Sequence, residues 1–76
     1  MTQAIPELTV IATCYNEEEN ARPIYEAVTR EITTSLPGYD YEILFIDNKS
    51  TDGTREILRA ICAEDKHVKA IFNLKN

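Results

Sequence analysis

The segment YEILFID, residues 41 to 47, places the strongest constraint on the fold. Residues 43 to 46 are consecutive apolar side chains, whereas a strand with one wet face would alternate apolar and polar residues. A strand of this kind is covered on both faces, which is typical of a parallel sheet. The run then stops at Asp47 and a polar loop. The segment therefore predicts a parallel strand that leads directly into polar residues.

The remaining segments predict a regular alternation of strands and helices. Residues 8 to 13, LTVIAT, and 68 to 72, VKAIF, have the β-branched and apolar composition of strands. Between Asn20 and Leu36, apolar residues recur at steps of three and four, which predicts a helix. A second helix is expected after Thr51, which we predict to be its N-cap. The inner face of that helix would consist of Thr54, Ile57, Leu58 and Ile61.

The predicted order βαβαβ restricts the topology. Crossovers between parallel strands are right-handed, so strands added in the order 1-2-3 would place both helices on one face of the sheet. The other face would then be bare, although the run at 43 to 46 has apolar side chains on both faces. We therefore expect either a piece of a larger doubly wound α/β domain or a subunit that buries this face in a homo-oligomer.

Composition excludes several classes of protein. The chain has 76 residues, enough for one small domain, and a formal charge of -5, which disfavours nucleic acid and anionic membrane surfaces as partners. Cys14 and Cys62 lie far apart without paired histidines, so neither a zinc site nor a redox motif is predicted. No apolar run reaches the ~18 residues of a membrane span. We expect reduced thiols and a cytoplasmic location.

Two polar loops, CYNEEEN at 14 to 20 and DNKSTDG at 47 to 53, follow the first two strands. The carboxyl ends of parallel strands share one edge, where open α/β sheets bind ligands, so these loops should meet at a crevice. Their many acids would repel a bare phosphate unless a divalent cation intervened. No glycine-rich phosphate-binding motif is present. Carboxylates and amides are suited instead to the N–H groups of a base and to sugar hydroxyls.

The two motifs together carry a family resemblance. TVIATCYNEEEN, followed about thirty residues later by YEILFIDNKSTDGT, resembles the N-terminal part of family 2 glycosyltransferases, most closely the polyprenyl-phosphate sugar transferases related to dolichol-phosphate mannose synthase. The resemblance implies a Rossmann-like nucleotide-diphospho-sugar transferase fold, an inverting reaction and a role in cell-wall or lipid-linked glycan synthesis. It also implies a nucleotide-diphospho-sugar donor, Mg²⁺ or Mn²⁺, a hydroxyl or polyprenyl-phosphate acceptor, and action at the cytoplasmic face of a membrane.

The resemblance assigns substrate-binding roles residue by residue. Tyr15 resembles the aromatic residue beside the base, Glu17 the acid that contacts the nucleoside, and Asp47 the strand-end carboxylate that binds base or ribose. Asn48 stands where many members have a second Asp, and Thr13 where the usual residue is Pro. Lys49 replaces a frequent Gly, which affects the loop shape.

The family's metal-binding D-x-D motif and catalytic base lie beyond residue 76. The resemblance therefore implies that residues 1–76 are a single N-terminal fragment of a catalytic domain. We expect it to be inactive alone, without catalytic or metal-binding residues.

Several alternatives remain open from the sequence. Ser50, Thr51 and Asp52 are better explained as capping residues than as ligands, because they precede a helix. Tyr15 could equally be a packing aromatic. The chain could be a phospho-acceptor signalling module with Asp47 as the acceptor, although the chain is short for that class. It could also be a structural α/β module that assembles through its bare sheet face.

Overall fold

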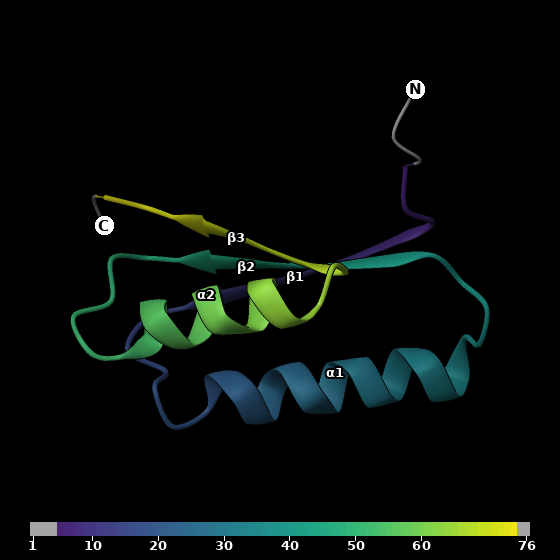
Figure 1. The fold of residues 1–76 in the computed structure, drawn as a ribbon, viewed down its shortest axis with the longest axis horizontal. Coiled ribbons are helices and arrows are strands. Elements are labelled where there is room, and N and C mark those ends of the chain that lie inside the picture. Colours follow the sequence, from purple (N-terminus) through teal and green to yellow (C-terminus); the bar gives the residue numbers. More distant parts are fainter. Residues whose placement is uncertain (1–4, 75–76) are drawn as a thin grey trace.

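The computed structural model describes residues 5–74, which form two layers (Figure 1). One layer is a parallel sheet of three strands: β1 (Leu8–Cys14), β2 (Tyr41–Asp47) and β3 (Val68–Phe72). The other layer holds α1 (Ala21–Ser35) and α2 (Thr54–Glu64), and both helices lie on the same face of the sheet. The predicted βαβαβ order is confirmed, and the chain has the Rossmann-like α/β architecture.

The strands pair in the order β1-β2-β3. Leu8 is level with Tyr41 at one end of β1, and Cys14 is level with Asp47 at the other. On the other side of β2, Asp47 is level with Phe72. All three strands therefore end at the same carboxyl edge, which brings the segments that follow them together.

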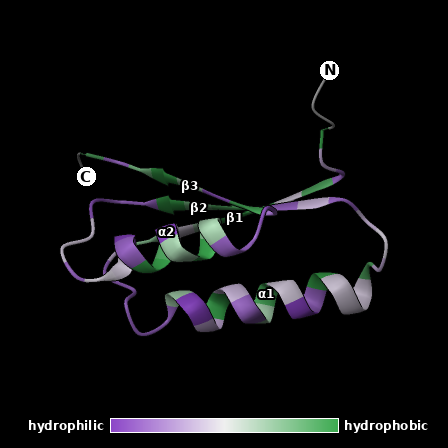
Figure 2. Cartoon of the chain, viewed as in Figure 1, coloured by the Kyte–Doolittle hydropathy of each residue, from purple (hydrophilic) through white to green (hydrophobic). Residues whose placement is uncertain are grey.

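Alternate residues of β2 face the helices and form the core. Ile43 and Phe45 are fully buried, as are Leu58 and Ile61 of α2. Val68 of β3 lies beside them, only 2% exposed. Figure 2 shows hydrophobic residues along β2 and β3, and both helices mix hydrophobic and hydrophilic positions around their circumference, as amphipathic helices do.

The start of α2 differs from the prediction. Gly53, not Thr51, occupies the N-cap position, and the predicted cap at Thr51 is wrong. Thr51 instead donates its backbone N–H to the side chain of Asn16 in the other loop. The predicted inner face is confirmed, because Thr54, Leu58 and Ile61 are buried and Ile57 packs against the core.

The opposite face of the sheet carries apolar side chains without a covering layer in residues 5–74; we call it the open face. Ile11 is 61% exposed and Ile71 is 49% exposed. The register places Ile11 beside Leu44 and Ile46 beside Ile71, and the two β2 side chains are half-buried. The expectation of a bare apolar face is confirmed for the described residues.

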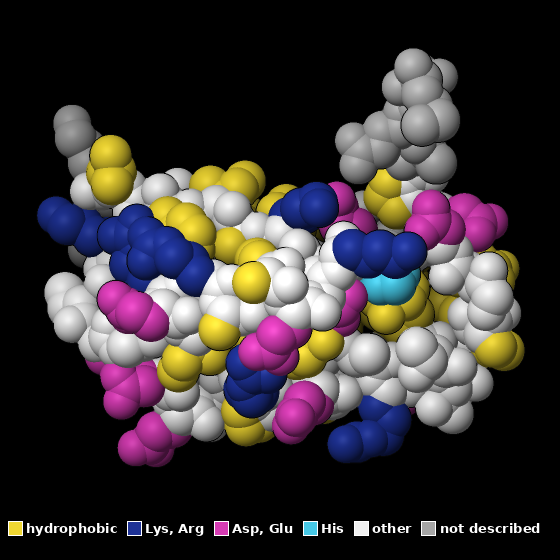
Figure 3. Space-filling model, in the orientation of Figure 1, with side chains coloured by type: hydrophobic (Ala, Val, Ile, Leu, Met, Phe, Trp, Pro, Cys, Tyr) yellow, Lys and Arg dark blue, Asp and Glu magenta, His cyan; other side chains and the backbone are white. Residues whose placement is uncertain are grey.

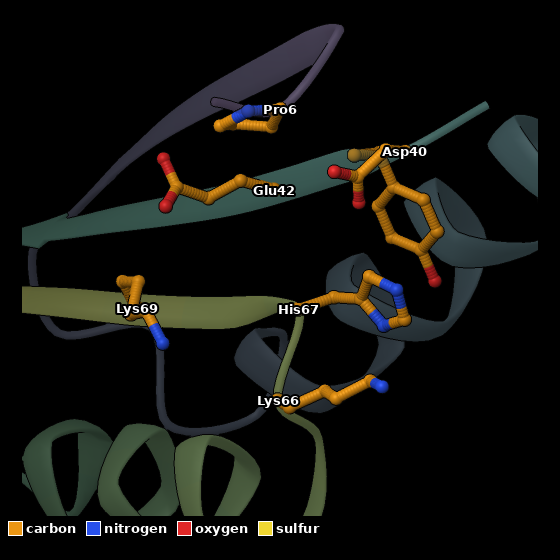
Figure 4. A pocket seen from close by; sticks show the side chains of 7 residues that line it. Pro6, Asp40, Glu42, Lys66, His67 and Lys69 are labelled. Atoms are coloured by element: carbon orange, nitrogen blue, oxygen red, sulfur yellow. The ribbon is translucent and has the colours of Figure 1, made fainter. Parts of the chain in front are cut away.

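At the amino ends of the strands, a cluster of polar and aromatic side chains joins both layers. The Tyr25 hydroxyl donates to Asp65 at 2.6 Å, and this bond, with burial, raises the pKa of Tyr25 to about 12. The ring of His67 stacks on Tyr41 with centroids 4.1 Å apart. An open hollow of about 190 Å³ lies here, lined by His67 with Lys66, Lys69 and other residues (Figure 4). It lies at the opposite edge of the sheet from the polar loops.

We expect the two faces of the sheet to differ sharply in their contribution to stability. Ile43→Ala, on the helix-covered face, should lower the free energy of unfolding by about 2–5 kcal/mol, because it leaves a cavity in the core. Ile71→Ala, the matched change on the open face, should cost much less. Urea unfolding followed by circular dichroism measures both, and Ile43→Val provides a milder variant. Equal losses at the two positions would contradict this assignment of the core.

Candidate functional site

The two polar loops meet at the carboxyl edge, as predicted. The backbone N–H of Asn16 donates to the Ser50 hydroxyl at 2.9 Å, and that of Glu17 donates to the Thr54 hydroxyl at 2.8 Å. In the other direction, Thr51 donates its N–H to Asn16 Oδ1 at 2.8 Å. Each loop thus satisfies polar groups of the other, so the two loops form one unit.

Asp47 is the innermost polar residue of this edge and is 0% exposed. Its carboxylate accepts two hydrogen bonds from Ser50, one from the backbone N–H at 3.0 Å and a short one from the hydroxyl. Arg55 Nε lies 3.8 Å from the same carboxylate and provides a positive charge. The structure therefore gives Asp47 a role in holding the second loop, and its predicted contact with a nucleoside stays a prediction.

The sequence analysis assigned no site role to Arg55. It lies in the first turn of α2, where its guanidinium carbon is 5.0 Å from the centre of the Phe72 ring. Arg59, one turn later, lies 4.7 Å from the same ring. Figure 3 shows Lys and Arg side chains gathered on the side of the molecule where α2 begins and β3 ends. The signal was an Arg in the helix that follows a strand-end Asp.

Two carboxylates bind the amino end of α2. Glu18 accepts a short hydrogen bond from the backbone N–H of Gly53, and Asp52 accepts one from Thr54 N–H at 2.9 Å. The Thr54 hydroxyl, which also donates to Asp52, is the main cause that lowers the pKa of Asp52. A Cβ on Gly53 would lie 2.5 Å from Glu18 Oε1, so a larger residue at this position would displace the Glu18 carboxylate from the helix terminus. These acids satisfy the helix terminus.

A second group of predicted site residues lies toward the open face of the sheet or just past the ends of the strands. Thr13 precedes the buried Cys14 by one position, so strand alternation places Thr13 on the open face, where it is exposed. Asn48 follows the helix-facing Asp47 and continues the ladder by donating its N–H to Cys14 O at 2.8 Å. Tyr15 stands just past the end of β1 and is 51% exposed. These side chains, unlike that of Asp47, are accessible in whole or in part.

Glu17 lies between the two groups. Its backbone N–H is held by Thr54, and its carboxylate accepts from the Asn20 side chain at 3.1 Å. The side chain is half-buried at the mouth of the first loop. Beneath it, burial is the main cause that raises the pKa of the Cys14 thiol, with smaller effects from Glu17 and Asp47. Cys14 is thus a core residue.

Comparison with known proteins decides the family. Residues 9–76 match the family described as Glycosyl transferase family 2. The chain belongs to that family. It is 44% identical over 59 residues to glycosyltransferase AglE of Haloferax volcanii, covering 78% of this chain and 18% of that protein. It is 33% identical to the bactoprenol glucosyl transferase of Shigella phage SfX, over 92% of this chain and 22% of the relative.

A third similar protein is the succinoglycan biosynthesis protein ExoA of Rhizobium meliloti, 33% identical over 87% of this chain and 19% of that protein. The resemblance to family 2 glycosyltransferases is therefore confirmed. The chain spans about a fifth of the length of these relatives. Within residues 5–74, neither helix has the length and apolarity needed to cross a membrane.

Membership in family 2 gives meaning to one departure from the family pattern. Lys49, where the resemblance implies a Gly in many members, has φ +62°, in the left-handed region that glycine adopts at little cost. Asn16 has φ +50° in the facing loop, and Asn is among the residues that tolerate this region best. The second loop therefore keeps a left-handed residue even without the glycine.

The described residues do not form a site for the divalent cation that family 2 enzymes commonly use. In residues 5–74 no three His, Cys, Asp or Glu side chains are grouped so as to hold a metal ion. The acids nearest the edge, Asp47, Asp52 and Glu18, already accept hydrogen bonds from Ser50, Thr54 and Gly53. Within residues 5–74, these carboxylates therefore serve to hold the loops and the start of α2.

We expect Asp47→Ala to disorganise the edge. The change leaves the buried Ser50 N–H without its acceptor and Arg55 without its counter-charge, so the free energy of unfolding should fall by about 1–3 kcal/mol. Asp40→Ala, which removes an exposed acid before β2, should stay within about 0.5 kcal/mol of wild type. Urea unfolding measures both. Similar values for the two variants would show that Asp47 does not hold the loop.

Proposed function

We propose that this chain is the nucleoside-binding part of a glycosyltransferase that uses a nucleotide-diphospho-sugar donor. The observation that carries the proposal is the division of the carboxyl edge. One set of groups, around Asp47, holds the two loops together, while Thr13, Tyr15 and Asn48 remain accessible beside them. Family membership supports sugar transfer as the activity of the complete enzyme.

Each accessible residue suits one part of a nucleoside. The exposed ring of Tyr15 offers a surface on which a base can stack. The amide of Asn48 and the hydroxyl of Thr13 can form hydrogen bonds with a base edge, and Glu17 can accept from ribose hydroxyls. Asp47 contributes by keeping Ser50, and through it Asn16, in place. Because the Asp47 side chain is 0% exposed, its direct contact with the ligand would require the groups that cover it to move.

In the complete enzyme, an acceptor oxygen would attack the anomeric carbon of the sugar as the bond to the diphosphate breaks on the opposite side. That displacement inverts the anomeric carbon. The proton of a hydroxyl acceptor would pass to a base outside residues 1–76. The described residues of this chain bind and orient the donor and take no part in the exchange of bonds. We expect the fragment alone to be inactive.

The remaining partners are proposed from the family. The relatives named as bactoprenol glucosyl transferases support a polyprenyl phosphate as one acceptor class, and the one named for succinoglycan biosynthesis supports a glycan hydroxyl as another. Mg²⁺ or Mn²⁺ would be held by residues outside this chain. We propose a cytoplasmic location, at the cytoplasmic face of the membrane for the full-length protein. The phospho-acceptor alternative loses support because Asp47 is fully buried.

An NMR titration of the ¹⁵N-labelled chain with UDP, GDP and CDP, with and without Mg²⁺, tests nucleoside binding. We expect shifts at residues 12 to 17 and 47 to 50, selective for one base. Tyr15→Ala should weaken binding roughly tenfold, the effect of one lost stacking contact. Tyr39→Ala is a matched control, because Tyr39 is 49% exposed and lies before β2 at the other edge. A folded chain that responds to none of the nucleotides would refute the proposal.

A second candidate is self-assembly through the open face. Ile11 and Ile71 are exposed apolar side chains on neighbouring parts of that face, with Leu44 and Ile46 between them. We propose that the isolated chain forms a homo-oligomer by burying this surface, because exposed apolar patches favour association.

Sedimentation velocity tests this second candidate. The wild-type chain should show a sedimentation coefficient that rises with concentration, and Ile11→Lys with Ile71→Lys should keep the chain monomeric. Ala27→Lys with Thr34→Lys adds the same two charges on the exposed side of α1 and should leave the association unchanged. A wild-type chain that stays monomeric at all concentrations would exclude the oligomer.

A further inference from the structure

Asn73, which the family resemblance does not include, contacts Asn48, whose amide we propose binds the base. Asn73 follows the last residue of β3, and its backbone N–H donates to Asp47 O at 2.9 Å, so the ladder continues past the end of the strand. The side-chain amide of Asn73 then donates from Nδ2 to Asn48 Oδ1 at 2.9 Å. Both side chains are half-buried at the carboxyl edge. The ends of β2 and β3 therefore carry an amide pair.

The chemistry of an amide makes this contact directional. An asparagine side chain has one acceptor, its oxygen, and one NH₂ group that only donates. The bond from Asn73 uses one of the two lone pairs of Asn48 Oδ1 and holds this oxygen on the side of β3, so the NH₂ group of Asn48 lies on the other side of the planar amide. No hydrogen bond from this NH₂ group to another residue within 5–74 is found. An Asp at position 48, as in many family members, could only accept. The two residue types would contact different atoms of a base.

We propose that Asn73 is a positioning residue that fixes the amide of Asn48 with its NH₂ group toward the base. The site then contacts an acceptor on the base edge, a ring nitrogen or a carbonyl oxygen. This inference rests on the proposed nucleoside-binding function. Asn73 acts through Asn48 and sets base preference.

A purely structural role for Asn73 would have a different effect. If Asn73 only closed the end of β3, its replacement would change stability and weaken all nucleotides alike. A positioning role changes the preference between bases. Uracil and cytosine are the sharpest pair of probes, because they differ only at ring positions 3 and 4. At position 3 uracil presents an N–H donor, whereas cytosine presents an acceptor nitrogen.

The decisive variant is Asn73→Asp, which keeps the shape but leaves only acceptor atoms. The new carboxylate cannot donate to Asn48 Oδ1; it accepts from the NH₂ group of Asn48, so the amide turns over and presents its oxygen. The ratio of the Kd for UDP to the Kd for CDP should then change roughly tenfold relative to wild type, the effect of exchanging about one hydrogen bond. The ratio falls if Asn48 contacts ring position 3 and rises if it contacts position 4, where uracil is the acceptor. The added negative charge weakens both nucleotides similarly and cancels in the ratio.

The measurement is an NMR titration of the 76-residue chain with UDP and with CDP, in which the side-chain ¹⁵N signals of Asn48 are followed. Asn73→Ala should move the ratio part of the way, because the amide is then free to turn. If Asn73→Asp does not fold, the ratio of the Kd for UDP to the Kd for CDP in Asn73→Ala tests the positioning role instead. An unchanged ratio in a folded variant that binds would overturn the positioning role and leave the proposed function standing. A folded wild-type chain that binds none of UDP, CDP and GDP would overturn both.

Discussion

The carboxylate of Asp47 must be satisfied inside the protein, and the carboxyl edge is arranged around it. A buried unpaired carboxylate would cost several kcal/mol, about the range found for broken buried ion pairs. Ser50 supplies two hydrogen bonds and Arg55 a positive charge. Ser50 in turn accepts from Asn16 after β1, and Arg55 lies over Phe72 at the end of β3. One acid therefore connects the ends of all three strands.

This arrangement separates the groups that hold the site from the groups that can bind a ligand. Strand alternation directs Asp47 toward the helices, and the next residue, Asn48, toward the other side. The acids near the start of α2 accept from backbone N–H groups that would otherwise lack partners. The high density of acids in the two loops is therefore explained largely by loop and helix structure. The ligand-binding chemistry falls to a few residues beside them.

The sequence predicted the elements well because each had a strong local signal. The bounds 41 to 47 and 68 to 72 match β2 and β3, and α1 fills the segment predicted between Asn20 and Leu36. The sequence did not show which face of the sheet Asp47 points to. Residues 43 to 46 are all apolar, so apolar and polar residues do not alternate along this strand and neither face can be identified as the core. Asn73 follows its strand as Asn48 follows β2, and this parallel was the available signal. The contacts of Arg55 with Asp47 and Phe72 could not be predicted, because they depend on the register of β3, which sets Phe72 level with Asp47.

The open face links the two proposals, because the accessible site residues and the exposed apolar side chains belong to the same side of the sheet. Thr13 is level with Ile46, which is level with Ile71, so the exposed patch reaches the last residues before the loops. Any layer that covers Ile11 and Ile71 must approach Thr13 as well. Covering this face and binding a ligand at its edge are therefore coupled. A covering element that stops short of the carboxyl edge would form a wall of the crevice. A covering element that extends over the edge would close the crevice. Since this chain matches only about a fifth of each relative, another segment of such a protein can supply the wall. A second copy of the chain would instead compete with the ligand wherever it reaches Thr13.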